Sequence, residues 1–122
     1  MFRILVIDDN MDLAKIYNFM LGDSSEFQII DSAADGIEGV EKYFSLKPEI
    51  VLLDHRMPGK DGIETTVEIL SQDKNAKIIF TSADISVKAK ALSLGAKAFL
   101  SKPFTENLLL TTLRKVANNT LD

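Results

Sequence analysis

The segment EIVLLDHRMPG, residues 49–59, places a single carboxylate at the end of a short apolar run. The run from Ile50 to Leu53 has a proline before it and a Pro-Gly pair after it, a pattern typical of a strand buried on both faces of a parallel sheet. Asp54 therefore stands at the carboxyl end of the strand, the edge at which open α/β sheets bind ligands. An Asp ahead of a Pro-Gly pair is also ordinary turn chemistry, so this segment alone leaves both a turn residue and a functional carboxylate open.

Similar apolar runs recur along the chain, and each is followed by a segment of helical periodicity. We predict strands at residues 3–7, 27–30, 50–53, 77–81 and 98–100. The five helices that follow them are predicted to face the core through Leu13, Ile16, Tyr17, Met20 and Leu21; Ile37, Val40, Tyr43 and Phe44; Ile63, Val67, Ile69 and Leu70; Ile85, Ala89, Ala91 and Leu92; and Leu109, Leu113 and Val116. Five strands alternating with five helices predict a doubly wound α/β fold, in which helices cover both faces of a parallel sheet.

Length and composition restrict the classes of protein that fit. We expect residues 1–122 to form one domain without an attached output domain, because a chain of this length holds a single hydrophobic core. The sequence has no cysteine, which excludes disulfides and thiolate metal sites and favours a cytoplasmic location. A net charge of -4 with dispersed basic residues argues against nucleic acid as a partner. No apolar run approaches the roughly 20 residues that span a bilayer, so we expect no membrane partner.

The polar residues of interest follow the predicted strands directly. Asp8 and Asp9 come after the first strand, Asp54 after the third, Thr81 ends the fourth, and Lys102 follows the fifth. Any one of them could be a turn residue. Because the carboxyl ends of parallel strands meet at one edge of the sheet, we expect all five side chains to converge there.

Convergence of carboxylates creates an electrostatic problem, since two of them about 5 Å apart repel by on the order of 3 kcal/mol at an effective dielectric constant of about 20. Either one carboxyl stays protonated or a cation binds. Oxygen ligands with open positions for water suit Mg²⁺. Lys102 can attract a phosphoryl group as a point charge, and Thr81 adds a hydroxyl donor. A carboxylate beside a metal ion and a lysine is suited to forming an acyl phosphate.

Two other classes of protein share part of this pattern. A flavodoxin has the same fold, but it needs a hydroxyl- and glycine-rich loop after the first strand, where this chain has the acidic run DDNMD at residues 8–12. A phosphatase of the haloacid dehalogenase type also uses an Asp nucleophile with Mg²⁺. It has Asp-x-Asp after its first strand, and the segment Asp54-His55-Arg56 lacks the second acid. Both alternatives fit the sequence poorly.

Several short motifs stand at the ends of the predicted strands and in the turns between them. They are Ile7-Asp8-Asp9, Asp35-Gly36, the run from Leu53 to Gly62, Phe80-Thr81-Ser82-Ala83, Gly95-Ala96 and Lys102-Pro103-Phe104. Together they resemble the receiver domain of two-component response regulators, in particular the single-domain chemotaxis regulators. The resemblance extends from Arg3 to about Val116, and it implies a flavodoxin-like strand order of 2-1-3-4-5.

This resemblance implies roles for the acidic residues that follow the first and third strands, and for Arg56 and Lys102. Asp54 is the phosphoacceptor and also a metal ligand. Asp8, Asp9 and the backbone carbonyl of Arg56 are the other protein ligands of a Mg²⁺ ion, and no organic cofactor is expected. Lys102 binds the phosphoryl oxygens as part of the catalytic group.

The resemblance also implies a switch. Thr81 binds a phosphoryl oxygen and, with Phe99, changes position on activation, while the Lys102-Pro103 peptide bond is cis. Phe99 stands where the family commonly has tyrosine, so its two positions would differ by packing rather than by a polar anchor. An ordinary core aromatic remains an alternative for Phe99. His55, which could suggest phosphohistidine chemistry, is expected in a surface loop.

The implied function is signalling rather than ordinary enzyme catalysis, with chemistry limited to phosphotransfer to the chain itself and autodephosphorylation. We expect a histidine kinase or a phosphotransfer protein to supply the phosphoryl group. The phosphorylated form would bind a target protein through the fourth helix, fifth strand and fifth helix, as a monomer or a phosphorylation-linked dimer. A phosphorelay intermediate or phosphate sink fits the same residues. A fold that no longer switches is disfavoured, because the acidic, hydroxyl and lysine residues are all present.

Two further expectations concern the surface. Leu108 and Leu110 fall outside the predicted core stripe of the last helix, and Leu108 is the one expected to be exposed unless the stripe is broad enough to bury both. Arg56 and Ala83 are expected to flank the position from which water attacks phosphorus. A long Arg side chain there covers the phosphoryl group, and Ala cannot orient water, so we expect a persistent phosphate.

Overall fold

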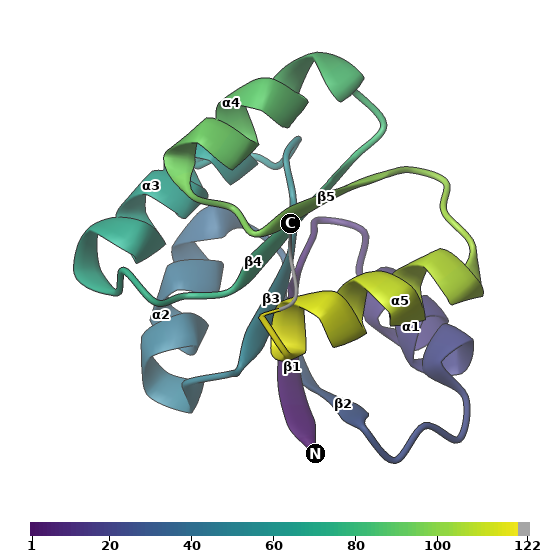
Figure 1. Ribbon diagram of the computed structural model, residues 1–122. Helices are drawn as coiled ribbons and strands as arrows, with labels where there is room; N and C mark the ends of the chain where they lie inside the picture. Colours follow the sequence, from purple (N-terminus) through teal and green to yellow (C-terminus); the bar gives the residue numbers. More distant parts are fainter. Residues whose placement is uncertain (120–122) are drawn as a thin grey trace.

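Five parallel strands form one sheet in the order β2-β1-β3-β4-β5 (Figure 1). The computed structural model describes residues 1–119. The strands are β1 (Phe2–Ile7), β2 (Phe27–Ala33), β3 (Ile50–Asp54), β4 (Ile78–Ser82) and β5 (Ala98–Ser101). The predicted doubly wound fold and strand order are thus confirmed, and Asp54 is the last residue of its strand.

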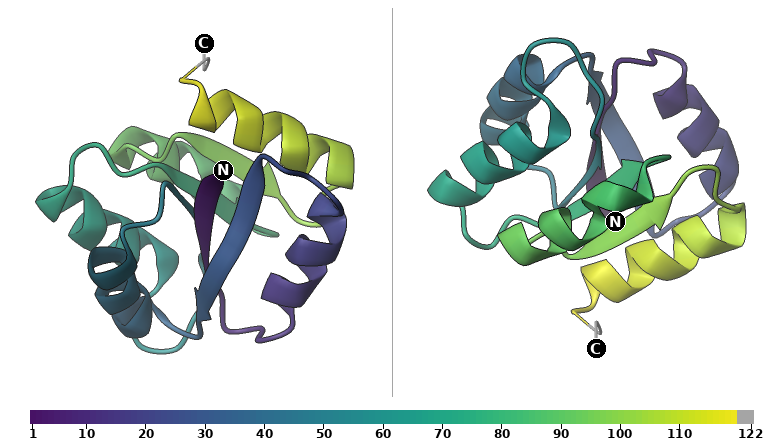
Figure 2. Two further views of the ribbon diagram at one scale, coloured as in Figure 1. Left: turned by 90° about the horizontal axis from the view of Figure 1, so that it is seen from below. Right: turned by 90° about the horizontal axis from the view of Figure 1, so that it is seen from above.

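The helices cover both faces of this sheet. They are α1 (Leu13–Leu21), α2 (Gly36–Leu46), α3 (Gly62–Gln72), α4 (Lys88–Leu94) and α5 (Glu106–Ala117). As Figure 2 shows, α1 and α5 lie on one face, and α2, α3 and α4 on the other. A short 3-10 helix, η1 (Ile85–Val87), precedes α4, and Asp84 caps it by accepting a hydrogen bond from the backbone N–H of Ser86 at 3.0 Å. Within residues 1–119, no helix is long and apolar enough to cross a membrane.

The central strands carry the core on both sides. In β1, Leu5 and Ile7 pack toward α2 and α3, while Ile4 and Val6 pack toward α1 and α5. All of β3 and β4 is buried. Continuous burial explains why these strands read as unbroken apolar runs rather than as alternating patterns.

The edge strand β2 is longer than predicted, because it continues through polar residues to Ala33. It pairs with β1 alone, so its outer side meets water and tolerates Asp31 and Ser32. Lys42 of α2 covers this end of the strand, with its ammonium 3.2 Å from Asp31. An apolar run therefore predicts the start of β2 but underestimates its end.

Six residues predicted to face the core are exposed instead: Ile16 (46%), Ile37 (60%), Val67 (47%), Ile85 (66%), Leu92 (39%) and Ala89. Small residues occupy the buried faces of α2 and α3, namely Gly36, Gly39, Thr65 and Thr66. The two helices approach closely at the start of α2, where a Cβ on Gly36 would collide with the hydroxyl oxygen of Thr65. Close helix packing, rather than apolar periodicity, decides which face is buried here.

Gly39 packs directly against the sheet in the middle of α2. A Cβ at this position would lie 2.6 Å from Cδ1, 2.9 Å from Cγ2 and 3.0 Å from Cγ1 of Ile7, which is fully buried. These close contacts involve both branches of the Ile7 side chain. A single rotation of that side chain therefore cannot remove all three of them. Glycine here permits α2 to lie close to β1, the strand that precedes Asp8.

We predict that Gly39→Ala destabilises the protein by about 1 kcal/mol. Overpacking of a dense core costs roughly 1–3 kcal/mol, and the gain in helix propensity, about 1 kcal/mol, offsets only part of it. Urea unfolding gives the change, and Ile7→Val, which removes Cδ1, should make the substitution less harmful in a double-mutant cycle. A Gly39→Ala protein as stable as the parent would show that Ile7 moves aside freely.

Candidate functional site

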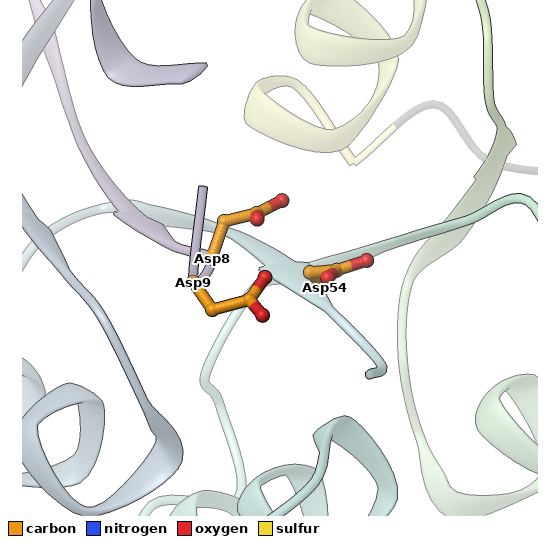
Figure 3. A group of neighbouring side chains, drawn as sticks. All are labelled: Asp8, Asp9 and Asp54. Atoms are coloured by element: carbon orange, nitrogen blue, oxygen red, sulfur yellow. The ribbon is translucent and has the colours of Figure 1, made fainter. Parts of the chain in front are cut away.

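Three carboxylates meet at the carboxyl edge of the sheet (Figure 3). Asp8 continues the ladder beyond β1, since its N–H donates to the carbonyl of Ala33 at 2.9 Å. Its carboxylate accepts from the N–H of Asn10 at 2.9 Å, which tightens the loop. Asp9 follows in this loop, and Asp54 ends β3 in register with Thr81 of β4. The parallel topology therefore brings the predicted acidic residues together.

The geometry of this acidic group suits a hard divalent cation. Asp8, Asp9 and Asp54 each offer an oxygen, and these atoms all lie within 4.8 Å of one another. Asp8 and Asp54 are 4% and 9% exposed, whereas Asp9 is open to solvent. Oxygen-only ligands with one open side match the preference of Mg²⁺ for a few carboxylates and several waters. The residues present are therefore compatible with Mg²⁺.

Lys102, which directly follows β5, reaches the same acidic group. Its N–H donates to the carbonyl of Ser82 at 2.9 Å, which fixes the chain after β5. The ammonium donates to Asp8 at 2.8 Å and to Asp54 at 3.3 Å. The Lys102-Pro103 peptide bond is cis, as predicted. In this form of the protein, the lysine is the counter-charge of the two buried carboxylates.

Burial and neighbouring charge act against each other at this site. Burial, and then the negative charge of Asp8, raise the pKa of Asp54, although Lys102 opposes them. Burial lowers the pKa of Lys102, but the hydrogen bond to Asp8 and the nearby negative charges outweigh it, so the pKa is raised. The lysine stays charged, and a further cation at this site would favour the ionised form of Asp54.

The proposed switch residues are held by other contacts in this form. Thr81 is 1% exposed, and its hydroxyl donates to the carbonyl of Leu53 at 3.3 Å, a long hydrogen bond. Phe99 is half-buried, and its ring stacks on Phe80 with centroids 6.1 Å apart. The structure thus brings the carboxylates and Lys102 together, whereas the Thr81 hydroxyl bonds to a backbone carbonyl and Phe99 packs on Phe80.

An open cleft lies above Asp54. The residues that line it are Asp9, Asp54, Arg56, Ser82, Ala83, Asp84 and Lys102. The Arg56 side chain is 80% exposed and lies 3.4 Å from the carboxylate of Asp84 on the opposite loop. Arg56 and Ala83 therefore flank the cleft on opposite sides, with an extended charged side chain on one and a methyl group on the other.

The loop after Asp54 is held by the first residue of α3. A Cβ on Gly62 would collide with the carbonyl of Asp54 and lie 2.7 Å from Cα of His55, so only glycine fits. The N–H of Gly62 donates to the carbonyl of His55 at 2.8 Å. His55 lies in this loop, as expected, but it is half-buried rather than fully exposed, with its ring 5.7 Å from that of Phe80.

The sequence pattern assigns Tyr17, a residue beside the site, only to the core. Tyr17 of α1 is 3% exposed, and Thr81, Lys102, Asp8 and Asp54 are near enough to affect the ionisation of its hydroxyl. Burial raises the pKa of Tyr17. The available signal was that Tyr17 is the single member of the predicted stripe of α1 with a polar atom.

Comparison with known proteins supports one family. The chain matches the response regulator receiver domain over residues 4–114. It is 37% identical over 119 residues to the chemotaxis protein CheY of Listeria monocytogenes, covering 96% of this chain and 99% of that protein. CheY of Thermotoga maritima is 38% identical over 120 residues, covering 94% and 97%.

Solved structures agree with the sequence relatives. The CheY chain in the CheX-CheY-BeF3-Mg complex from Borrelia burgdorferi superimposes with a TM-score of 0.87 at 37% identity, covering 94% of this chain and 88% of that one. The response regulator domain of Thermotoga maritima CheB gives a TM-score of 0.87 at 26% identity, covering 97% of both. With its fold, its acidic edge and these relatives in agreement, the chain belongs to the response regulator receiver domain family and is similar to the CheY proteins of chemotaxis.

Proposed function

We propose that this chain is a response regulator that accepts a phosphoryl group on Asp54 from a histidine kinase or a phosphotransfer protein. The observation that carries the proposal is the convergence of Asp8, Asp9 and Asp54 within 4.8 Å at a cleft that Lys102 also lines. The proposed regulator works in the cytoplasm, and its output is a change of protein partner.

The transfer step needs an ionised nucleophile facing the cleft. A carboxylate oxygen of Asp54 attacks phosphorus, an oxygen–phosphorus bond forms, and the bond from phosphorus to the imidazole nitrogen of the donor histidine breaks. The bonding pair leaves with the imidazole. Hydrolysis removes the phosphoryl group. Water attacks phosphorus and releases inorganic phosphate and the Asp54 carboxylate.

The side chains around Asp54 assist by charge and position. Asp8, Asp9, Asp54 and the backbone carbonyl of Arg56 would hold Mg²⁺, which neutralises charge on phosphoryl oxygens when bound. Lys102 exchanges its carboxylate partners for a phosphoryl oxygen. Thr81 turns its hydroxyl from the Leu53 carbonyl to another phosphoryl oxygen, and the long bond it leaves makes this exchange easy.

A partner surface is proposed on α4, β5 and α5. Leu108 is 47% exposed, as predicted, whereas Leu110 packs partly against the core. Ile85 and Leu92 are also exposed, at 66% and 39%, so this side of the molecule carries apolar groups that a protein can cover. Phosphorylation adds about -1.5 to -2 charges beside Thr81 and, through Phe99, would change the shape of this surface.

We predict that a small phosphodonor such as acetyl phosphate adds one phosphoryl group to the parent in the presence of Mg²⁺ and none to Asp54→Asn. The amide lacks the nucleophilic oxygen anion. Intact-mass spectrometry measures the product, with Asp23→Asn, an exposed loop aspartate, as the matched control. Equal labelling of Asp54→Asn and the parent would place the acceptor elsewhere.

Arg56→Ala should shorten the lifetime of the phosphate. The extended arginine covers the approach of water, and its loss is expected to speed dephosphorylation about fivefold, equivalent to roughly 1 kcal/mol in the barrier. Loss of label over time gives the rate. Arg114→Ala, an exposed arginine paired with Glu26 away from the cleft, controls for a general charge effect. An unchanged rate in Arg56→Ala would refute the shielding role.

Leu108→Glu should weaken binding of a target protein to the phosphorylated form by about tenfold or more, because a charge would be buried at the interface. The target is a protein that co-purifies only with phosphorylated chain, and its affinity is measured by titration. Ile37→Glu, at an exposed apolar site on α2, is the control. If Leu108→Glu binds as tightly as the parent, the output surface lies elsewhere. Failure to find any such target would favour a phosphate sink.

A further inference from the structure

Tyr17 occupies the boundary between the acidic site and a groove on α1. Its ring stacks on Phe104, with centroids 5.7 Å apart and an interplanar angle of 25°. Together with Lys102, Pro103 and Phe104, it lines a mostly apolar groove between α1 and the loop that leads from β5 to α5. Lys102 lines both this groove and the cleft above Asp54. Tyr17 therefore shares the groove with a residue that also belongs to the acidic site.

Packing accounts for the ring of Tyr17 but not for its hydroxyl. Within residues 1–119, this buried hydroxyl makes no hydrogen bond. Thr81 is close enough for its hydroxyl to affect that of Tyr17, yet no hydrogen bond of ordinary geometry joins them in this form. Buried polar atoms without a partner are uncommon and unfavourable. Phenylalanine would fill the same space without this penalty.

Thr81 offers the missing partner once it turns. In this form, its hydroxyl proton is directed to the carbonyl of Leu53. When the proton is given to a phosphoryl oxygen instead, the Thr81 oxygen keeps lone pairs that can accept from a neighbouring hydroxyl. Successive hydrogen bonds of this kind polarise and strengthen one another.

We propose that Tyr17 is a positioning residue of the phosphoryl site, whose hydroxyl donates to Thr81 when Asp54 is phosphorylated and holds Thr81 turned toward the phosphoryl group. This role rests on the proposed phosphorylation of Asp54. If Tyr17 has this role, α1 and Phe104, on which the Tyr17 ring stacks, respond to phosphorylation in addition to the surface of α4, β5 and α5.

Tyr17→Phe tests the role, because it keeps the ring and removes the hydroxyl. The probe is beryllofluoride with Mg²⁺, a mimic of the phosphoryl group, and calorimetry measures its affinity for the full chain. We expect Tyr17→Phe to weaken binding about 3- to 10-fold, the range of one net hydrogen bond. The same variant without beryllofluoride should unfold at the same temperature as the parent or a higher one.

Tyr43→Phe is the matched control, because Tyr43 donates to Asp73 on the opposite side of the sheet, and its loss should leave the affinity unchanged. In a Thr81→Ala background, Tyr17→Phe should have no further effect, whereas a general packing defect would weaken binding in both backgrounds. Equal affinity of Tyr17→Phe and the parent, or equal weakening in both backgrounds, would overturn the role of Tyr17 alone. A parent that binds no beryllofluoride would overturn the proposed function together with it.

Discussion

The rest of the structure depends on one electrostatic constraint, the placement of buried carboxylates around a single ammonium group. Asp8 and Asp54 share Lys102 in a setting that raises the pKa of Asp54. A carboxyl whose folded pKa lies above its unfolded value subtracts stability as the pH rises from the unfolded pKa through the folded one, and the loss is complete above both. At neutral pH, Asp54 therefore works against the fold. The apolar faces of β1, β3 and β4, which are buried against helices on both sides of the sheet, offset this loss.

Unfavourable features gather beside the same edge. Within residues 1–119, the buried side-chain atoms without a hydrogen-bond partner are the Tyr17 hydroxyl, Nδ1 of His55 and the Thr66 hydroxyl. Tyr17 adjoins Lys102 and Thr81, and His55 follows Asp54 directly. Local rules are most often violated where function requires a second arrangement of the same groups. The unpaired Tyr17 hydroxyl and the long bond from Thr81 to Leu53 mean that the Thr81 side chain is only weakly held in this form.

The elements and the acidic edge were predictable, whereas side-chain directions were not. Parallel topology alone brings Asp8 and Asp54 together, so a sequence that shows where strands end also shows which carboxylates meet. The exposure of Val67 was not predictable, because periodicity counts apolar residues while close packing of α2 on α3 selects small ones. The direction of the Thr81 hydroxyl and the approach of Tyr17 to it depend on contacts between residues distant in sequence, which no local pattern encodes.

Phe80 shows how the acceptor loop and the proposed switch can be linked without a polar anchor. Its ring is fully buried in β4 and contacts His55, next to Asp54, on one side and Phe99 of β5 on the other. Phe99 has no hydroxyl, so its position depends on the space beside this ring. Close-packed interiors transmit small displacements because they have few voids. Movement of Thr81, the next residue after Phe80, would therefore shift the surface on which Phe99 rests, and the aromatic row could replace the hydrogen bond that a tyrosine would make.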